Sequence, residues 1–216
     1  MTPKAVFWDM DGTLIDSEPL HERSLVAALK SVGIQPPGDL HERVIGVAAL
    51  PVYEMLRDEF GLSLPFNEWI VRKYDHYFKN VHTLKPRQGA VEIFKLLHER
   101  GTPQAIVSNS DRLVVNANMK ALGLDWPTLK SISRNDVRNP KPDPEPYTHA
   151  AWLLGVDPAD CCVVEDSWTG ATAGVEAGMK TLLWVQEPSQ PPAGAVLLLT
   201  ADELRYHLGL PGRIVA

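Results

Sequence analysis

The chain has 216 residues, of which 44% are hydrophobic and 22% are charged. This composition is ordinary for a soluble globular protein of one or two domains, and it excludes disordered, collagen-like and disulfide-rich chains. The 27 acidic residues outnumber the 21 basic residues, which gives a net charge of −6. The bulk charge therefore favours neither nucleic acid nor an anionic membrane as a partner.

The two cysteines, Cys161 and Cys162, are adjacent in the sequence. Neighbouring residues on a strand point to opposite faces, so this pair is poorly placed to form a disulfide, and we expect two small buried side chains in a reducing compartment. The N-terminal apolar run is too short for a signal peptide, and no run approaches the roughly 18 residues of a membrane span. We expect a cytoplasmic protein with no membrane partner, and a monomer.

The first predicted strand is the apolar run Ala5–Trp8, which has no polar position and is typical of a strand buried on both faces. It ends at Asp9-Met10-Asp11-Gly12-Thr13, where Gly12 permits a tight backbone. From residue 17 to residue 83 the pattern is helical. Helices are predicted before Gly33, at 52–60 and at 66–80, which indicates a helical subdomain inserted after the first strand.

From Lys85 onward, strand and helix patterns alternate. Strands are predicted at 104–108, 129–133, 161–165, 181–185 and 195–200, and helices at 88–100, 111–122, 143–154, 169–177 and 201–208. Repeated β-α units predict an α/β fold with a parallel sheet covered by helices on both faces. Ligands of such sheets bind at the carboxyl ends of the strands.

Pairs of carboxylates follow two of these strands. Asp9 and Asp11 follow the first strand, and Glu165 and Asp166 follow the strand at 161–165. Carboxylates this close together raise one another's pKa unless a cation lies between them. The first pair suits either a metal site or a nucleophile with a proton carrier. The second pair suits a hard divalent cation such as Mg²⁺.

Two further strand-end features suit an anion. Ser108-Asn109 follows the strand at 104–108, where a hydroxyl, an amide and free backbone N–H groups can form either a phosphate pocket or a simple helix cap. Lys141 precedes Pro142-Asp143-Pro144 and is either a solvated loop lysine or a fixed charge for a phosphate. In combination, these strand ends predict a metal-and-phosphate site.

The run from Phe7 to Ser17 resembles the first motif of the haloacid dehalogenase superfamily. Ser108-Asn109 resembles the second motif, Lys141 the third and Glu165-Asp166 the fourth. The resemblance covers nearly the whole chain and is similar to the branch that contains β-phosphoglucomutase and sugar phosphatases. It implies a Rossmann-like core at 1–16 and 84–216, a helical cap at 17–83, Mg²⁺, and phosphoryl transfer through an aspartyl-phosphate.

The resemblance also implies roles for individual residues. Asp9 is expected to be the nucleophile and a metal ligand, and Asp11 the general acid/base, with its backbone carbonyl on the metal. Glu165 and Asp166 complete the metal site. Ser108 and Lys141 are expected to hold the phosphate, with backbone N–H groups of Gly12, Thr13 and Asn109. His21 and Lys73 of the cap are expected to contact the rest of a small phosphorylated metabolite.

The loop Gly46-Val47-Ala48-Ala49 departs from the mutase pattern, because a mutase carries an arginine there for a second phosphate. We therefore favour a phosphatase over a phosphosugar mutase. A metal-independent haloacid dehalogenase does not need Asp11, Glu165 and Asp166 together. A non-catalytic phospho-acceptor or binding protein remains a further alternative, although receiver domains are shorter and carry no inserted cap.

Overall fold

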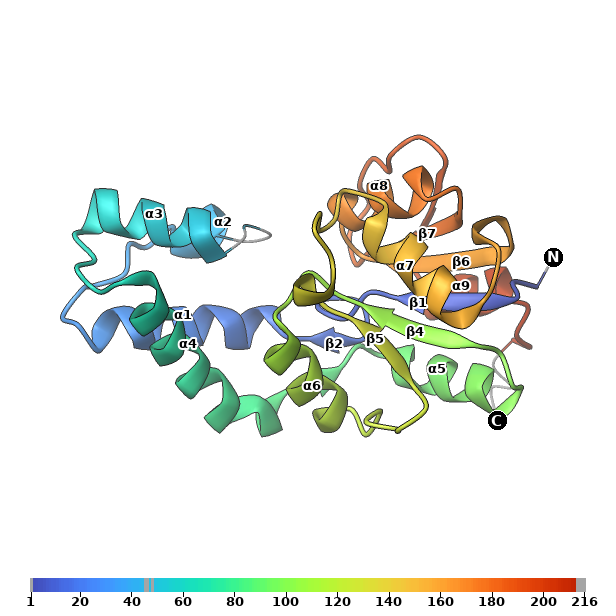
Figure 1. The fold of residues 1–216 in the computed structure, drawn as a ribbon, viewed down its shortest axis with the longest axis horizontal. Helices are drawn as coiled ribbons and strands as arrows, with labels where there is room; N and C mark the ends of the chain where they lie inside the picture. Colours follow the sequence, from blue (N-terminus) through green and yellow to red (C-terminus); the bar gives the residue numbers. More distant parts are fainter. Residues whose placement is uncertain (1, 45–46, 48, 213–216) are drawn as a thin grey trace. The chain divides into compact units, whose positions relative to one another are not determined.

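The computed structural model describes residues 2–44, 47 and 49–212 of the chain. These residues divide into two compact units, which Figure 1 shows with the chain coloured from its N-terminus to its C-terminus. The first unit comprises Met1–Asp16 and Lys85–Ala216, and the second comprises Ser17–Leu84.

The first unit is built on a six-stranded sheet in the order β5-β4-β1-β6-β7-β8, and every neighbouring pair is parallel. This confirms the predicted α/β class. The strands are β1 (Ala5–Trp8), β4 (Gln104–Val107), β5 (Lys130–Ile132), β6 (Cys161–Glu165), β7 (Lys180–Trp184) and β8 (Ala195–Leu198). All side chains of β1, β4 and β6 are buried, as their continuous apolar runs predict.

Helices cover both faces of this sheet (Figure 1). α5 (Ala90–Glu99) and α6 (Arg112–Ala121) lie on one face, and α7 (Glu145–Leu154) and α8 (Trp168–Glu176) lie on the other. This division follows from right-handed crossovers that run one way from β1 to β5 and the other way from β5 to β7. α9 (Ala201–His207) packs beside α5, where Arg205 contacts Glu92.

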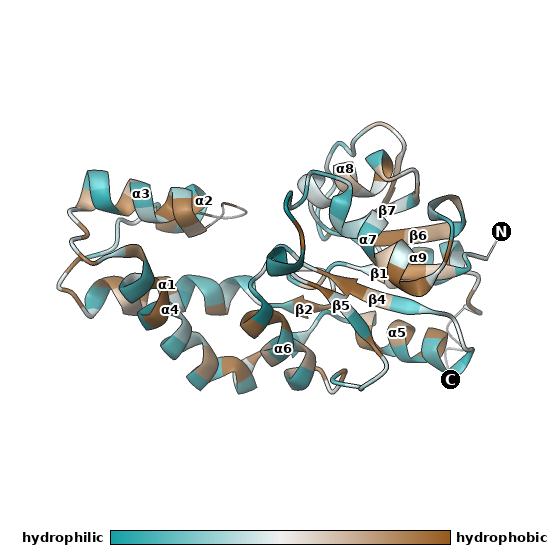
Figure 2. Ribbon diagram, viewed as in Figure 1, coloured by the Kyte–Doolittle hydropathy of each residue, from teal (hydrophilic) through white to brown (hydrophobic). Residues whose placement is uncertain are grey.

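The core alternates along each strand. Phe7 of β1 and Val163 of β6 belong to a cluster with Tyr147 of α7, whereas Trp8 lies 5.7 Å, between ring centroids, from Phe94 of α5. Figure 2 shows β4 and β6 largely hydrophobic and the covering helices striped. Cys161 and Cys162 are both free and buried, as expected for two small apolar side chains on a central strand.

A short antiparallel pair, β2 (Ile15–Asp16) with β3 (Lys85–Pro86), lies where the chain leaves the first unit and returns to it. The sequence did not predict it, because two-residue strands carry no measurable periodicity. Three single-turn helices also escaped prediction for the same reason, namely η1 (Val81–Thr83), η2 (Arg134–Asp136) and η3 (Pro158–Asp160).

The second unit is entirely helical in its described residues. It contains α1 (Glu18–Lys30), α2 (Leu40–Val44), α3 (Ala49–Phe60) and α4 (Phe66–Asn80). α1 packs against α4, and Leu25, Leu29, Leu56 and Trp69 form part of its own hydrophobic core. The five-residue α2 was not predicted. No helix in the described part of either unit is both long and apolar enough to cross a membrane.

Candidate active site

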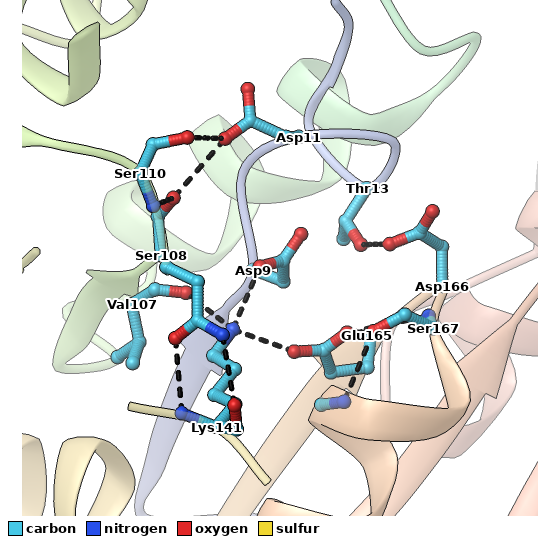
Figure 3. A network of polar contacts seen from close by, with 12 residues as sticks. Asp9, Asp11, Thr13, Val107, Ser108, Ser110, Lys141, Glu165, Asp166 and Ser167 are labelled. Atoms are coloured by element: carbon cyan, nitrogen blue, oxygen red, sulfur yellow. Dashed lines mark hydrogen bonds and ion pairs between the residues drawn. The ribbon is translucent and has the colours of Figure 1, made fainter. Parts of the chain in front are cut away.

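The carboxyl ends of the three central strands bring the predicted polar residues together (Figure 3). Asp9 follows β1, Ser108 follows β4, and Glu165 is the last residue of β6. Because these strands are parallel neighbours, the three side chains emerge at the same edge of the sheet. Asp9, Ser108 and Glu165 are all buried, so the site lies within the first unit rather than on an exposed surface.

Lys141 lies at the centre of this group. Its Nζ donates to Asp9 Oδ1 (2.7 Å), to Glu165 Oε1 (2.6 Å) and to the Val107 carbonyl (2.7 Å). Burial acts to lower the pKa of Lys141, but the two carboxylates outweigh it and raise the pKa above its usual value. Lys141 is therefore a buried, charged link between β1 and β6 and not a solvated loop lysine.

The loop that carries Lys141 is fixed by two side chains. The Asn109 side chain donates to the Lys141 carbonyl and accepts from the Lys141 N–H, both at 3.0 Å. The Glu145 carboxylate accepts the backbone N–H groups of Arg138 and Asn139, both at 2.9 Å. These bonds lower the pKa of Glu145. The amide of Asn109, expected near a phosphate, thus orients Lys141 in this structure.

Three carboxylates form a group that can hold a cation. Asp9, Glu165 and Asp166 each offer an oxygen within 4.8 Å of the others. Burial raises the pKa of Asp9 well above its usual range, and Glu165 raises it further, although Lys141 opposes both. Burial and Glu165 raise the pKa of Asp166 to about 7. A donor set of crowded, buried carboxylates that resists ionisation without a counter-charge fits a hard divalent cation.

The oxygens of Glu165 already have partners in the protein. Oε1 accepts from Lys141 and from the Tyr147 hydroxyl (2.7 Å), and Oε2 accepts from the Ser167 hydroxyl (3.0 Å). Asp166, in contrast, accepts one side-chain hydrogen bond, from Thr13 Oγ1 at 2.9 Å. Asp166 and Asp9 therefore have more open coordination capacity than Glu165, which instead orients Lys141.

The Asp11 carboxylate accepts hydrogen bonds from a separate group of side chains. Its Oδ2 accepts from the Ser108 hydroxyl (3.1 Å) and the Ser110 hydroxyl (2.7 Å), and its Oδ1 accepts from Asn118 Nδ2 (3.1 Å). Figure 3 shows the Asp11 carboxylate turned toward the two serines rather than toward Asp9. The Asp11 side chain is not part of the three-carboxylate group. Asp9 and Asp11, although only one residue separates them, therefore have different surroundings.

The turn that follows Asp11 is tightly packed. Gly12 has φ +88°, and a Cβ there would lie 2.0 Å from Asp166 Oδ2. Its N–H donates to the Ile15 carbonyl (2.8 Å), so the Gly12 N–H, expected to face a phosphate, is satisfied inside the turn. Among the residues that the structure describes, none accepts a hydrogen bond from the backbone N–H of Thr13 or of Asn109, and the role of these two groups toward a phosphate stays a prediction.

The expected cap residues lie in the second unit. His21 is on α1, where its ring stacks on Tyr77 with centroids 4.5 Å apart, and Lys73 is on α4. Within the loop at 46–49, Gly46 and Ala48 lie outside the described residues. Val47 is exposed and Ala49 begins α3. Their roles toward a substrate stay predictions.

Several residues that contact the site were not predicted from the sequence, among them Arg87, Ser110, Asn118 and Tyr147. Asn118 is fully buried on α6, where it follows Val114 by one helical turn. An amide at such an apolar position is a signal that could have indicated a buried partner. Tyr147 similarly occupies an apolar position of α7, and no local pattern marks Ser110 or Arg87.

Comparison with known proteins agrees with this geometry. A family model described as haloacid dehalogenase-like hydrolase matches residues 3–178. N-acetylmuramic acid 6-phosphate phosphatase of Pseudomonas aeruginosa is 31% identical over 84% of this chain and 81% of its own. 6-Phosphogluconate phosphatase of Escherichia coli is 29% identical over 88% and 86%, respectively.

A solved structure from Thermotoga maritima, described provisionally as a β-phosphoglucomutase, superposes with a TM-score of 0.80. It is 26% identical and covers 97% of this chain and 99% of its own. The family match spans all four motifs, from Asp9 to Asp166, and the structural match covers both units. The chain therefore belongs to the haloacid dehalogenase-like hydrolase family.

Proposed function

We propose that the protein is a Mg²⁺-dependent phosphatase that hydrolyses a small phosphorylated metabolite through a phosphoaspartate on Asp9. The observation that carries this proposal is the setting of Asp9. Its Oδ1 is held by Lys141, while Oδ2 is not a hydrogen-bond acceptor for any described residue. One carboxylate thus has a fixed orientation and an open oxygen, as a nucleophile requires.

The reaction divides into two displacements at phosphorus. First, Asp9 attacks the phosphoryl group, the bond from phosphorus to the ester oxygen breaks, and Asp11 gives a proton to the leaving alcohol. Then water attacks the phosphoaspartate, Asp11 takes a proton from that water, and Asp9 and inorganic phosphate are released. For this, Asp11 Oδ2 exchanges the Ser108 and Ser110 hydroxyls for substrate or water, while Asn118 keeps its hydrogen bond to Oδ1.

Asp9 and Asp166, with the backbone carbonyl of Asp11 as the family resemblance implies, would hold the Mg²⁺ ion. Bound there, it would neutralise charge on the phosphoryl oxygens. Glu165 contributes mainly by fixing Lys141, since both of its oxygens are already engaged. The raised pKa of Asp166 supports the choice of this group as the cation site.

The phosphoryl oxygens would meet three kinds of donor. Lys141 Nζ lies beside the attacking carboxylate, the Ser108 hydroxyl lies at the end of β4, and the backbone N–H groups of Thr13 and Asn109 complete the set. Positive charge and dipoles placed around a moving phosphoryl group stabilise its transition state. Gly12 contributes by the close approach that its missing side chain permits.

The substrate class follows from the relatives, whose names specify sugar-acid and amino-sugar phosphates. His21 and Lys73 of the second unit are proposed to contact the non-phosphate part of such a substrate. A β-phosphoglucomutase is the second candidate, favoured by the structural likeness to the Thermotoga maritima protein. The uncharged Ala49 opposes it, because a bisphosphate intermediate calls for a cation at that loop.

A screen of small phosphomonoesters with Mg²⁺, reading released phosphate, tests the proposal. It should include 6-phosphogluconate, hexose phosphates, hexitol phosphates and phosphoglycolate. We expect net phosphate release from at least one of them. Conversion of β-glucose 1-phosphate to glucose 6-phosphate without phosphate release would establish the mutase instead, and Mg²⁺-independent release of halide from a 2-haloacid would establish a dehalogenase.

A further inference from the structure

Arg87 directly follows β3 and donates a hydrogen bond to residues 11–13, here named the catalytic turn. Its backbone N–H donates to the Leu14 carbonyl (3.0 Å), and its side-chain Nη1 donates to the Gly12 carbonyl (3.1 Å). The same Nη1 donates to the Trp184 carbonyl at the end of β7 (2.7 Å). One side chain therefore connects the catalytic turn to the carboxyl end of β7.

The charge of Arg87 is held in an unusual way. Within the described part of the chain, no carboxylate forms an ion pair with it, and its guanidinium carbon lies 3.8 Å from the centre of the Trp184 ring. Burial lowers the pKa of Arg87, while Asp166 acts in the opposite direction. Stacking on the indole and two carbonyl acceptors offset the loss of hydration, so the cation stays close enough to act on Asp166.

The catalytic turn transmits the position of Arg87 to the site. A Cβ at Gly12 would overlap the Asp166 carboxylate, and Thr13 Oγ1 donates to Asp166 Oδ1. No space separates the turn from this carboxylate. A shift of the Gly12 carbonyl must therefore displace Asp11 on one side and Asp166 on the other, because close-packed groups do not absorb such shifts.

We propose that Arg87, supported by Trp184, is a positioning residue that sets the catalytic turn and Asp166 for phosphoryl transfer and for Mg²⁺ binding. The inference rests on the proposed phosphatase function. Two cationic side chains then share the positioning of the site. Lys141 fixes Asp9 and Glu165, whereas Arg87 fixes Asp11 and Asp166 through the turn. Arg87 touches neither the nucleophile nor the three-carboxylate group, so its effect is indirect.

Two variants test this role. In Arg87→Met the clamp and the charge are both lost. We expect kcat to fall by about ten-fold or more with little change in KM, because small misplacements near the reacting atoms have effects of this size. Calorimetric titration of the metal-free protein should show Mg²⁺ binding at least about three-fold weaker. Loss of a positive charge alone would strengthen cation binding, so weaker binding reports misplacement.

The second variant, Arg87→Lys, keeps the charge but loses the planar guanidinium, which stacks on the Trp184 ring while its Nη1 donates to both carbonyls. We expect its kcat to remain well below that of the wild type. Arg205→Met is the matched control, since Arg205 is also buried and donates to the Pro211 carbonyl away from the site. It should lower thermal stability while leaving kcat and Mg²⁺ affinity unchanged.

Wild-type kcat and Mg²⁺ affinity in folded Arg87→Met would overturn the inference, as would equal kcat losses in Arg87→Met and Arg205→Met. If Arg87→Met does not fold, wild-type kcat in Arg87→Lys overturns it. A wild-type protein inactive on every phosphomonoester refutes the proposed function instead. In that case the Mg²⁺ titration still decides on Arg87, since unweakened binding in its variants refutes the positioning role.

Discussion

Asn118 Nδ2 lies 3.1 Å from Asp11 Oδ1, across the gap between α6 and the turn after β1. The amide is fully buried and occupies a helical position whose neighbours, Val114 and Val115, belong to the core. Asn118 donates to Oδ1 while Ser110 donates to Oδ2, so the two side chains fix the orientation of the Asp11 carboxylate. This contact connects α6 to the proposed general acid/base, although none of the sequence motifs lies on that helix.

The first prediction concerns this amide. Asn118→Leu restores an apolar helix position but removes a hydrogen bond to a charged group, worth about 1.5–3 kcal/mol. We expect kcat to fall by roughly ten-fold or more, because the orientation of the Asp11 carboxylate is lost, and the melting temperature to fall as well, because Asp11 Oδ1 is left without this buried donor. Steady-state kinetics and thermal unfolding measure both. Met119→Leu, on the same helix, should change neither, and an unaltered kcat in Asn118→Leu would show that the contact has no catalytic role.

The second prediction concerns the nucleophile. Asp9→Asn should lose several orders of magnitude in kcat, because an amide cannot form the phosphoaspartate. Asp11→Asn should also be impaired, but it should accumulate phosphoenzyme, since the second displacement needs the base. Intact-mass spectrometry after brief exposure to substrate would detect the added phosphoryl group. Asp9→Asn with a tenth of wild-type activity would exclude this mechanism.

The third prediction concerns the metal. Chelation with EDTA should abolish phosphatase activity, and added Mg²⁺ should restore it. Mg²⁺ should also stabilise the folded protein, by ~2.7 kcal/mol at about one hundred times its dissociation constant. Thermal unfolding with and without Mg²⁺ measures this independently of turnover. Asp166→Asn should reduce the stabilisation, and full turnover in EDTA would contradict the assigned metal site.

The fourth prediction concerns acid sensitivity of the Lys141 loop. The pKa of Glu145 is lowered from its usual value near 4.5 by the N–H groups of Arg138 and Asn139. Its contribution to stability is therefore complete above about pH 4.5 and is lost as the pH falls through the lowered pKa. Urea unfolding at several pH values should show a smaller acid-induced loss in Glu145→Gln than in the wild type. Parallel pH curves for the two proteins would refute this contribution.

The fifth prediction concerns the second unit. If Lys73 contacts the substrate, Lys73→Ala removes a charge-assisted hydrogen bond worth about 1.5–3 kcal/mol and lowers kcat/KM by roughly ten- to a hundred-fold. An aryl phosphate, which has no sugar hydroxyls to contact, should lose much less. Comparing both substrates provides the test. Equal losses on the two would mean that Lys73 does not determine specificity.

The sequence predicts the sheet well because its central strands are uninterrupted apolar runs. The strand at 161–165 and the helix at 66–80 match the structure residue for residue. Boundaries differ where backbone geometry decides them. α5 begins at Ala90 rather than at residue 88, because Gly89 adopts φ +83° and cannot belong to a right-handed helix.

Within the site, the order of the motifs predicted which residues meet, but not which atoms pair. Lys141 was expected at a phosphate, and its three protein acceptors come from β1, β4 and β6, up to 132 residues away in sequence. Arg87 had no local pattern at all. Its importance depends on the Trp184 ring and the Gly12 carbonyl, which only the folded sheet brings together.

β1 is the first strand to be synthesised, but its pairing within the sheet is completed late. It carries Asp9, yet its two hydrogen-bonding edges are taken by strands that begin at Gln104 and Cys161. More than 150 further residues must be synthesised before both β4 and β6 exist, so the pairing of β1 has a high contact order. An incomplete chain that ends before Cys161 has an unpaired β1 edge and lacks Glu165 and Asp166 entirely. The nascent protein therefore acquires its chemistry only when the last central strand is added.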